Sequence, residues 1–319
     1  MNFRSELWKI LKLIKSITFE NSLFKISFCI TYLCNSKCKN CNIWEIYQKN
    51  PKKLKEELTL DEYEEIFSKL PSSVAILEFT GGEPFLKEDL SNIIISSLRF
   101  LNNPTIYIPT NGFATAKIEN TIQEIISSRA WRQSRSEINI GVSIDGGPKT
   151  HDYLRGVQGA YAKAWRTFKM LQEISKSEPR LKCFISCTLF DYNIRNKDVF
   201  IFIRMLRDNK IPYGLQSYNN SAYYNLTQND ESLPNASIFI KAIREEIIPM
   251  LSRKPLSKYF WYKAEGFLKN PKKLVLPCPA LKTFCAIDPY GNLWPCLMWP
   301  VKIASLKDYE YDIKKALNT

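Results

Sequence analysis

Histidine is almost missing from this chain of 319 residues, in which His151 is the single one. A His-rich metal site is therefore excluded, and a hydrolase with a Ser–His–Asp triad is disfavoured. No apolar run reaches the roughly eighteen residues of a membrane-spanning helix. The N-terminus also lacks the apolar stretch and small-residue cleavage site of a secretory signal. These absences predict a cytoplasmic protein.

Internal repeats and low-complexity tracts are absent too, and 45% hydrophobic with 24% charged residues is an ordinary globular composition. The formal net charge of +13 is compatible with a nucleic-acid, anionic-membrane or acidic-peptide partner. The lysines are spread along the whole chain, so a general compositional bias is the simpler explanation. Because no focused Lys/Arg run with interleaved aromatics is present, a nucleic-acid partner is not expected.

Cysteine, by contrast, is abundant, and its nine copies are unevenly placed. Two clusters hold three each, namely Cys34, Cys38 and Cys41, and Cys278, Cys285 and Cys296. An odd number of cysteines in a cytosolic chain argues against a disulfide framework and for metal or catalytic use. The remaining three stand in apolar, β-branched runs, and we expect them to be small buried residues on strands: Cys29, Cys183 and Cys187.

Strand-like and helix-like segments alternate through most of the chain. The strand-like runs are 23–31, 74–80, 105–109, 138–145, 181–190 and 211–217. Helical patterns lie between them, near 60–70, 88–102, 116–130, 159–177 and 196–209. The first helical pattern opens with a capping box, in which Thr59 is followed three residues later by Glu62. Such βα units predict an α/β fold whose parallel sheet curls into a partial (β/α)6 TIM-type barrel.

Both ends of the chain differ from this expected core, which we place at 21–217. The N-terminal segment 1–20 contains a basic amphipathic helix over 6–20, expected to cap the barrel, with contact to an anionic membrane as the alternative. Segment 218–276 is predicted to be a polar linker or substrate loop and two helices, 236–252 and 256–268. Tyrosines of that loop either line the pocket mouth or are structural: Tyr218, Tyr223 and Tyr224. A small Cys-rich extension occupies 277–319.

The first cysteine cluster directly follows the first expected strand, with the spacing C-x3-C-x2-C. Three thiolates on one short loop can hold three corners of a cubane iron–sulfur cluster and leave its fourth iron open to another ligand. A zinc site is the alternative, although structural zinc normally has four closed ligands. No fourth Cys or His lies just downstream. The three cysteines alone therefore leave both readings open.

Motifs at the ends of the next three strands favour the iron–sulfur cluster over the zinc site. The strands run into Gly81-Gly82-Glu83-Pro84, Pro109-Thr110-Asn111-Gly112 and Ser143-Ile144-Asp145-Gly146-Gly147-Pro148. The motif HDYLRG, residues 151–156, comes next. In this order and placement the motifs resemble the radical S-adenosylmethionine (SAM) superfamily, in its peptide-modifying and sulfatase-maturing branch, over residues 23–217. The resemblance implies SAM and a SAM-binding 4Fe–4S cluster on Cys34, Cys38 and Cys41.

The same resemblance implies roles for residues around SAM. It places the amino group of SAM against Gly81, Gly82 and Glu83, and its ribose and carboxylate against Ser143 and Arg155.

Two further positions near these motifs keep alternative readings. The chain departs from the family at Asn40, where an aromatic residue is usual. Trp44 either compensates for that missing aromatic residue or has a plain packing role. For His151, a hydrogen bond to Asp152 or to the backbone is favoured over proton transfer. Beyond these cofactor contacts, the sequence identifies no catalytic residue.

The second cysteine cluster resembles the opening of a SPASM/Twitch extension, C-x12-G-x4-C, through Cys278, Gly291 and Cys296. The resemblance implies a second, auxiliary 4Fe–4S cluster held by Cys278, Cys285 and Cys296, whose fourth ligand is not evident. AIDPYGNLW predicts a hairpin. The further cysteines of a full SPASM pattern are missing up to Thr319, so we expect a Twitch-like module. A zinc site or cysteines kept for packing are the alternatives.

The sequence therefore predicts a radical SAM enzyme, an iron–sulfur oxidoreductase or transferase. It would cleave SAM to a 5′-deoxyadenosyl radical that abstracts hydrogen from a substrate. A peptide or protein substrate is favoured, because SPASM/Twitch enzymes commonly modify such chains and the basic charge suits an acidic leader peptide. A lipid, sugar or other small metabolite is the alternative, and a zinc-binding basic nucleic-acid module is a minor one. An electron donor such as flavodoxin or ferredoxin is implied, and a peripheral membrane contact is an open option.

Overall fold

The computed structural model describes residues 23–218, 235–251, 255–270, 273, 275–299 and 301–317. The helix expected at 6–20, and Tyr223 and Tyr224, lie outside these residues. Within them, no helix has the length and apolar character needed to span a membrane.

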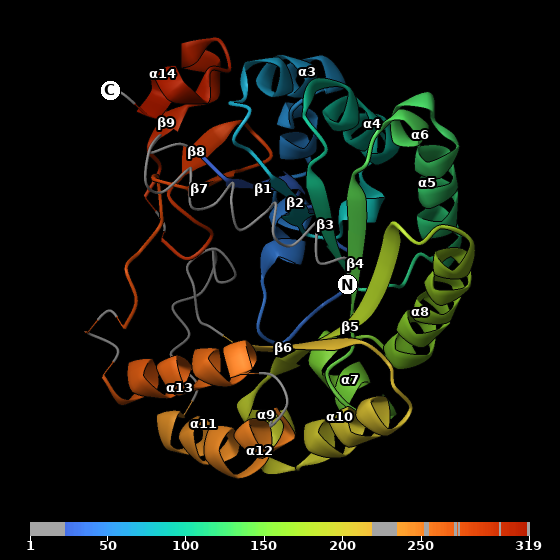
Figure 1. The fold of residues 1–319 in the computed structure, drawn as a ribbon, viewed down its shortest axis with the longest axis vertical. Helices are drawn as coiled ribbons and strands as arrows, with labels where there is room; N and C mark the ends of the chain where they lie inside the picture. Colours follow the sequence, from blue (N-terminus) through green and yellow to red (C-terminus); the bar gives the residue numbers. More distant parts are fainter. Residues whose placement is uncertain are drawn as a thin grey trace.

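A nine-stranded sheet runs through the described part of the chain in the order β6-β5-β4-β3-β2-β1-β7-β8-β9 (Figure 1). Strands β1 to β6 pair in parallel and in chain order. Their bounds are β1 (Lys25–Thr31), β2 (Ile76–Gly81), β3 (Thr105–Thr110), β4 (Glu137–Ser143), β5 (Leu181–Leu189) and β6 (Tyr213–Ser217). The six expected strands are thus confirmed, and their right-handed crossovers build a partial (β/α) barrel.

Helices cover the outer side of these strands (Figure 1). The long ones are α3 (Leu60–Lys69), α4 (Leu90–Phe100), α5 (Thr115–Ser127), α8 (Ala160–Ser177) and α10 (Asp198–Asp208). Short ones are α2 (Ile46–Lys49), α6 (Arg129–Gln133), α7 (Pro148–Arg155) and α9 (Asp191–Arg195). The capping box of α3 is present, because Thr59 accepts from the Glu62 N–H and the Glu62 carboxylate accepts from the Thr59 N–H.

Strand periodicity separates the core from the barrel interior. On β2, Leu77 and Phe79 are fully buried in the hydrophobic core that includes α3 and α4, whereas Glu78 and Thr80 line a cavity. This alternation follows from side chains pointing to opposite faces of a strand. The three cysteines expected to be buried on strands are confirmed as such: Cys29, Cys183 and Cys187.

The C-terminal part joins the same sheet. Strand β7 (Phe284–Ile287) pairs in parallel with β1, and β8 (Asn292–Trp294) and β9 (Ala304–Ser305) follow in antiparallel order (Figure 1). The expected hairpin is confirmed, and its turn is closed by the Asp288 carboxylate, which accepts from the N–H groups of Tyr290 and Asn292, each at 2.9 Å. Backbone pairing therefore crosses the boundary expected at residue 277.

The helices after β6 differ from expectation in one detail. The single helix expected at 236–252 is divided into α11 (Ala236–Ala242), a π-helical turn (Ile243–Ile247) and α12 (Ile248–Met250). Pro249 lies within α12, two residues after the π-turn, and a π-turn is one way to accommodate such an interruption of the hydrogen-bond ladder. Helix α13 (Pro255–Lys269) matches the second expected helix, and α14 (Ile313–Leu317) ends the described chain.

Candidate active site

The cysteine loop, residues 34–41, follows the C-terminal end of β1 and lies against the Gly81-Gly82-Glu83 motif. The N–H groups of Gly82 and Glu83 donate to the carbonyls of Thr31 and Leu33, both at 2.8 Å. A Cβ atom on Gly81 would stand 2.2 Å from the Thr31 oxygen, and one on Gly82 would stand 2.4 Å from the Leu33 oxygen. The two glycines are therefore required because this motif packs directly on the backbone that leads into the cysteine loop.

The thiols of the first cluster are close enough to influence one another electrostatically. Burial raises the pKa of Cys34, and the neighbouring Cys38 and Cys41 raise it further. Burial and Cys38 likewise raise the pKa of Cys41 to about 12. Metal ligation would reverse this cost, because a bound cation stabilises thiolates. The three thiols thus influence one another's ionisation.

A cavity of about 230 Å³ opens beside the cysteine loop at the C-terminal ends of the strands. Seven of the residues predicted around the first cluster and SAM line it: Cys34, Cys38, Cys41, Gly81, Gly82, Ser143 and Arg155. Asn40, Trp44 and Tyr218 line it too. The structure therefore brings together segments that are more than a hundred residues apart in sequence, from Cys34 to Ser143 and Arg155.

Glu83 does not line this cavity, and its side chain is only 1% exposed. Its carboxylate accepts from the Thr110 hydroxyl at 2.8 Å and from the Asn111 N–H at 2.7 Å. Burial raises the pKa of Glu83 to about 7, although these donors oppose the shift. Glu83 thus connects β2 to the motif after β3, and its contact with a SAM amino group stays a prediction.

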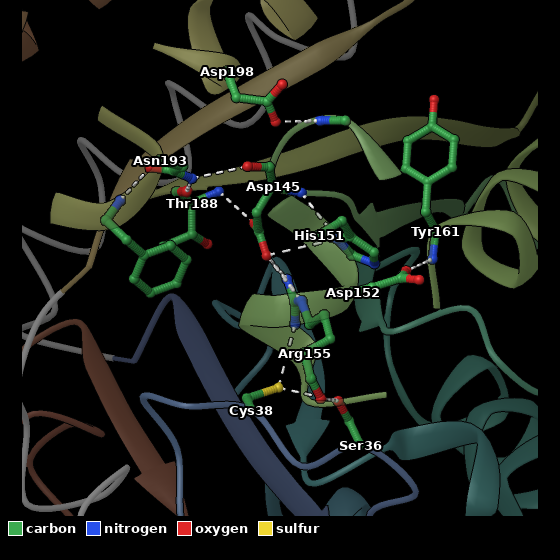
Figure 2. A network of polar contacts seen from close by, with 12 residues as sticks. Ser36, Cys38, Asp145, His151, Asp152, Arg155, Tyr161, Thr188, Asn193 and Asp198 are labelled. Atoms are coloured by element: carbon green, nitrogen blue, oxygen red, sulfur yellow. Dashed lines mark hydrogen bonds and ion pairs between the residues drawn. The ribbon is translucent and has the colours of Figure 1, made fainter. Parts of the chain in front are cut away.

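Arg155 lies between a carboxylate and a cysteine of the loop (Figure 2). Its Nη2 and Nε stand 2.7 Å and 2.8 Å from Asp145 Oδ2, and its Nη1 stands 3.9 Å from Cys38 Sγ. Burial alone would lower the pKa of Arg155, but Asp145 and Cys38 raise it, so the guanidinium stays charged. Asp145 is fully buried, and its other carboxylate oxygen accepts from the Thr188 N–H at 2.9 Å.

His151 is also fully buried, one turn before Arg155 on α7. Its Nδ1 accepts a hydrogen bond from the Asp145 N–H at 3.1 Å, which agrees with the expected backbone partner (Figure 2). Burial, and then the charge of Arg155, lower its pKa well below 6.5. Its Nε2 has no hydrogen-bond partner among the described residues. The neutral ring therefore fixes the β4–α7 connection and does not reach the cavity lining.

The second cysteine cluster is arranged differently. Cys285 lies on β7 opposite Ile26 and is fully buried in the main hydrophobic core. Burial is the sole cause that raises its pKa to about 12, in contrast to Cys34 and Cys41, whose neighbouring thiol contributes. Cys278 is exposed and Cys296 is partly buried. Leu297, the residue after Cys296, packs against the same small buried cluster as Cys41 and lines the cavity.

The donor set of the first cluster suits an iron–sulfur cubane. In the described part of the chain, no three His, Cys, Asp or Glu side chains converge on one metal-ion position. A cubane does not need such convergence, because each cysteine binds a different iron. Cys34, Cys38 and Cys41 border one cavity, with Arg155 beside Cys38 to balance negative charge. The residues present thus fit a 4Fe–4S cluster in which the three cysteines would hold three irons and leave the fourth without a cysteine ligand.

Two polar residues on the inner wall of the barrel were not predicted from the sequence to line the site. Glu78 lines the cavity, and its carboxylate pairs with Lys25 Nζ at 2.7 Å. Tyr107 also lines it and stacks on Phe184 with ring centroids 6.0 Å apart. The available signal was a polar residue at an inward position of an apolar strand, Glu78 in VAILEFT and Tyr107 in TIYIP.

Comparison with known families gives one match. The model of the radical SAM superfamily matches residues 28–194, just over half of the 319 residues. The sporulation killing factor maturation protein SkfB of Bacillus subtilis is 28% identical over 152 residues, which cover 45% of this chain and 32% of SkfB. Fe-coproporphyrin III synthase of Methanosarcina barkeri is 26% identical over 187 residues, 57% of this chain and 41% of that protein. The chain thus spans less than half the length of these relatives.

Solved structures share the fold. Native anSMEcpe with bound AdoMet superposes with a TM-score of 0.56 at 14% identity, covering 91% of this chain and 80% of that one. The same protein with AdoMet and Cp18Cys peptide gives a TM-score of 0.59 at 15% identity, covering 93% and 80%. Because identity is this low, the likeness establishes the architecture alone.

Proposed function

This chain belongs to the radical SAM superfamily and is a radical SAM enzyme, and on that premise we propose that it cleaves SAM reductively in the cavity beside Cys34, Cys38 and Cys41. The observation that carries the proposal is the common cavity, which the three cysteines share with Gly81, Gly82, Ser143 and Arg155. When bound, the 4Fe–4S cluster supplies one electron, and SAM supplies the 5′-deoxyadenosyl radical that abstracts hydrogen from a substrate.

The protein's own residues bind, orient and shield. The backbone of Gly81 and Gly82 lines the cavity and would bind the amino group of SAM, and Ser143, in the same lining, would bind its ribose. Arg155 stays charged beside Cys38 and suits a carboxylate, since a guanidinium can donate two parallel hydrogen bonds. Glu83 contributes by holding Thr110 and Asn111, unless its carboxylate turns toward the SAM amino group on binding.

A peptide or protein is the substrate class we propose. The similarity to SkfB, a maturation protein by name, supports this class. A net charge of +13 suits an acidic peptide, and it also suits an acidic flavodoxin- or ferredoxin-like electron donor. A small metabolite is the second candidate, because Fe-coproporphyrin III synthase and GTP 3′,8-cyclase of Mannheimia succiniciproducens are also similar to this chain. These functions are those of the relatives themselves.

An auxiliary cluster near Cys278 and Cys296 completes the proposal. Its support is the C-x12-G-x4-C pattern and the position of Leu297, which follows Cys296 and lines the cavity. Cys285 is left out as a ligand, because its side chain is enclosed in the core.

The first test is anaerobic reconstitution followed by two measurements, iron per chain and 5′-deoxyadenosine formed from SAM under dithionite. Each cubane contributes about four irons, so wild type should hold about eight, and a Cys34/Cys38/Cys41→Ala variant about four with no 5′-deoxyadenosine. A Cys29→Ala variant, altered at a buried strand cysteine, is the matched control and should behave like wild type. Zinc without sulfide in wild type would refute the radical mechanism. Four irons in wild type and none in the triple variant would remove the auxiliary cluster alone.

A further inference from the structure

The last turn of α7 contacts the cysteine loop through the backbone. The N–H groups of Lys37 and Lys39 donate to the carbonyls of Arg155 at 3.0 Å and Leu154 at 2.9 Å. These carbonyls belong to the end of a helix, where no intrahelical N–H remains to pair with them. The loop therefore supplies the partners that the helix end lacks, and the helix end orders the middle of the loop.

Ser36 adds a side-chain contact at the same place (Figure 2). Its hydroxyl donates to the Arg155 carbonyl at 3.1 Å and lies 3.1 Å from Cys38 Sγ. A single serine thus links the helix end to a cysteine that the first cluster needs. The position of Cys38 is set by α7 as well as by its own loop.

Gly156 permits this close approach. It caps α7 in the left-handed region, with φ at 64°, and a Cβ there would stand 2.2 Å from the Lys37 oxygen and 3.0 Å from the Lys37 carbonyl carbon. Both are backbone atoms, so any side chain at Gly156 must displace the cysteine loop itself. Gly159, three residues on, has a similar φ of 74° but nothing within 4 Å of its Cβ position.

The rest of α7 is anchored to the barrel. Asp145, after β4, binds Arg155 through its carboxylate and His151 through its N–H. The Asp152 carboxylate accepts from the N–H of Tyr161 at 2.8 Å (Figure 2) and from the N–H of Gly159 at 2.6 Å, which ties α7 to the start of α8. A turn held at so many points can serve as a rigid support.

We infer that the 154–156 turn is a template that holds the cysteine loop in its cluster-binding shape, so that the thiolates are positioned before iron arrives. The inference rests on the proposed function only in that the first cluster is bound by Cys34, Cys38 and Cys41. It assigns Gly156 and Ser36 as positioning residues, which act on the cluster through the loop and touch no substrate. Preordering a loop in this way slows the loss of whatever the loop binds.

The test compares Gly156→Ala with Gly159→Ala in the full chain. Both substitutions put alanine at positive φ and carry the same backbone strain, but only the first meets the cysteine loop. The readouts are iron per chain after anaerobic reconstitution, the rate of iron loss to excess EDTA, and the melting temperature of each apoprotein. Gly156→Ala should lose iron at least about tenfold faster than Gly159→Ala, and its apoprotein should melt lower, because displacing the loop removes one or two hydrogen bonds whether or not iron is bound.

Equal rates of iron loss in the two variants would overturn the inference. If Gly156→Ala does not fold, Ser36→Ala decides instead, because it removes only the hydroxyl that links Arg155 to Cys38. Iron loss about two- to fivefold faster than wild type supports the template, and an unchanged rate overturns it. Wild type that binds no cluster at all would refute the proposed function, an outcome separate from these comparisons.

Discussion

His151 takes its protonation state from complete burial. Its pKa is lowered well below 6.5, because a cation there would lack water and would face Arg155. A base whose folded-state pKa is depressed adds stability above its unfolded pKa and loses it as the pH falls below that value. The neutral ring should therefore persist in the folded apoprotein across the pH range in which free histidine titrates.

Proton NMR can check this directly, since His151 is the single histidine of the chain and its ring signal needs no assignment. We expect no titration of that signal in the folded apoprotein between about pH 5.5 and 8, and titration near about pH 6.5 in urea-unfolded protein. A folded-state midpoint between those limits would show that the ring is reached by water.

Sequence motifs could indicate the first site but not the residues that support it. Cys34, Cys38 and Cys41 were predictable because a local spacing encodes one chemical group. Asp145 stood in a quoted motif, yet its partner Thr188 lies 43 residues further on, so its role depends on how β4 and β5 align. Glu83 was recognised as functional, whereas the direction of its carboxylate is decided by Thr110 and Asn111 on the neighbouring strand end.

At the scale of elements, β7 determines the part that Cys285 plays. The strand pairs with β1 in the register Ile26↔Cys285, which turns the thiol into the hydrophobic core. Cys285→Ala should therefore keep the full iron content and lower the free energy of unfolding by about 1 kcal/mol, as expected for a small buried apolar group.

The comparison variant is Cys296→Ala, measured for iron per chain and urea unfolding in the same preparation. If Cys296 holds an auxiliary cluster, this variant loses about four irons and Cys285→Ala loses none. Loss of iron in Cys285→Ala would show that β7 rearranges when a cluster binds.

The strands of the barrel and its long helices followed from sequence patterns, and the short helices did not. The bounds of strand β5 and helix α8 were predicted accurately because their periodicities extend over many residues. Helix α7 is eight residues long and mostly polar, so HDYLRG gave no helical periodicity. Its signals were Pro148 at the first helical position and Gly156 at the C-cap, an asymmetry that marks helix ends.

For the molecule as a whole, strand pairing predicts a single cooperative unit. Because β7 pairs with β1 at the centre of the sheet, the amides of Phe284–Ile287 should exchange with deuterium as slowly as those of Lys25–Thr31. Hydrogen exchange of the apoprotein, read by mass spectrometry on the two segments, measures this. Much faster exchange in 284–287 would mean that the extension from residue 277 onward opens independently, as a separate domain would.

The position of β7 also bears on how such enzymes can be recombined. Exchange of domains between proteins works best through linkers that few contacts cross. A graft made at residue 277 would instead cut a backbone ladder, in which Phe28 and Ile287 are paired neighbours. Strand β1, which leads into the cysteine loop, therefore needs the β7 side chains that share its core, such as Cys285 and Ile287. A chimera would have to inherit both strands from one parent.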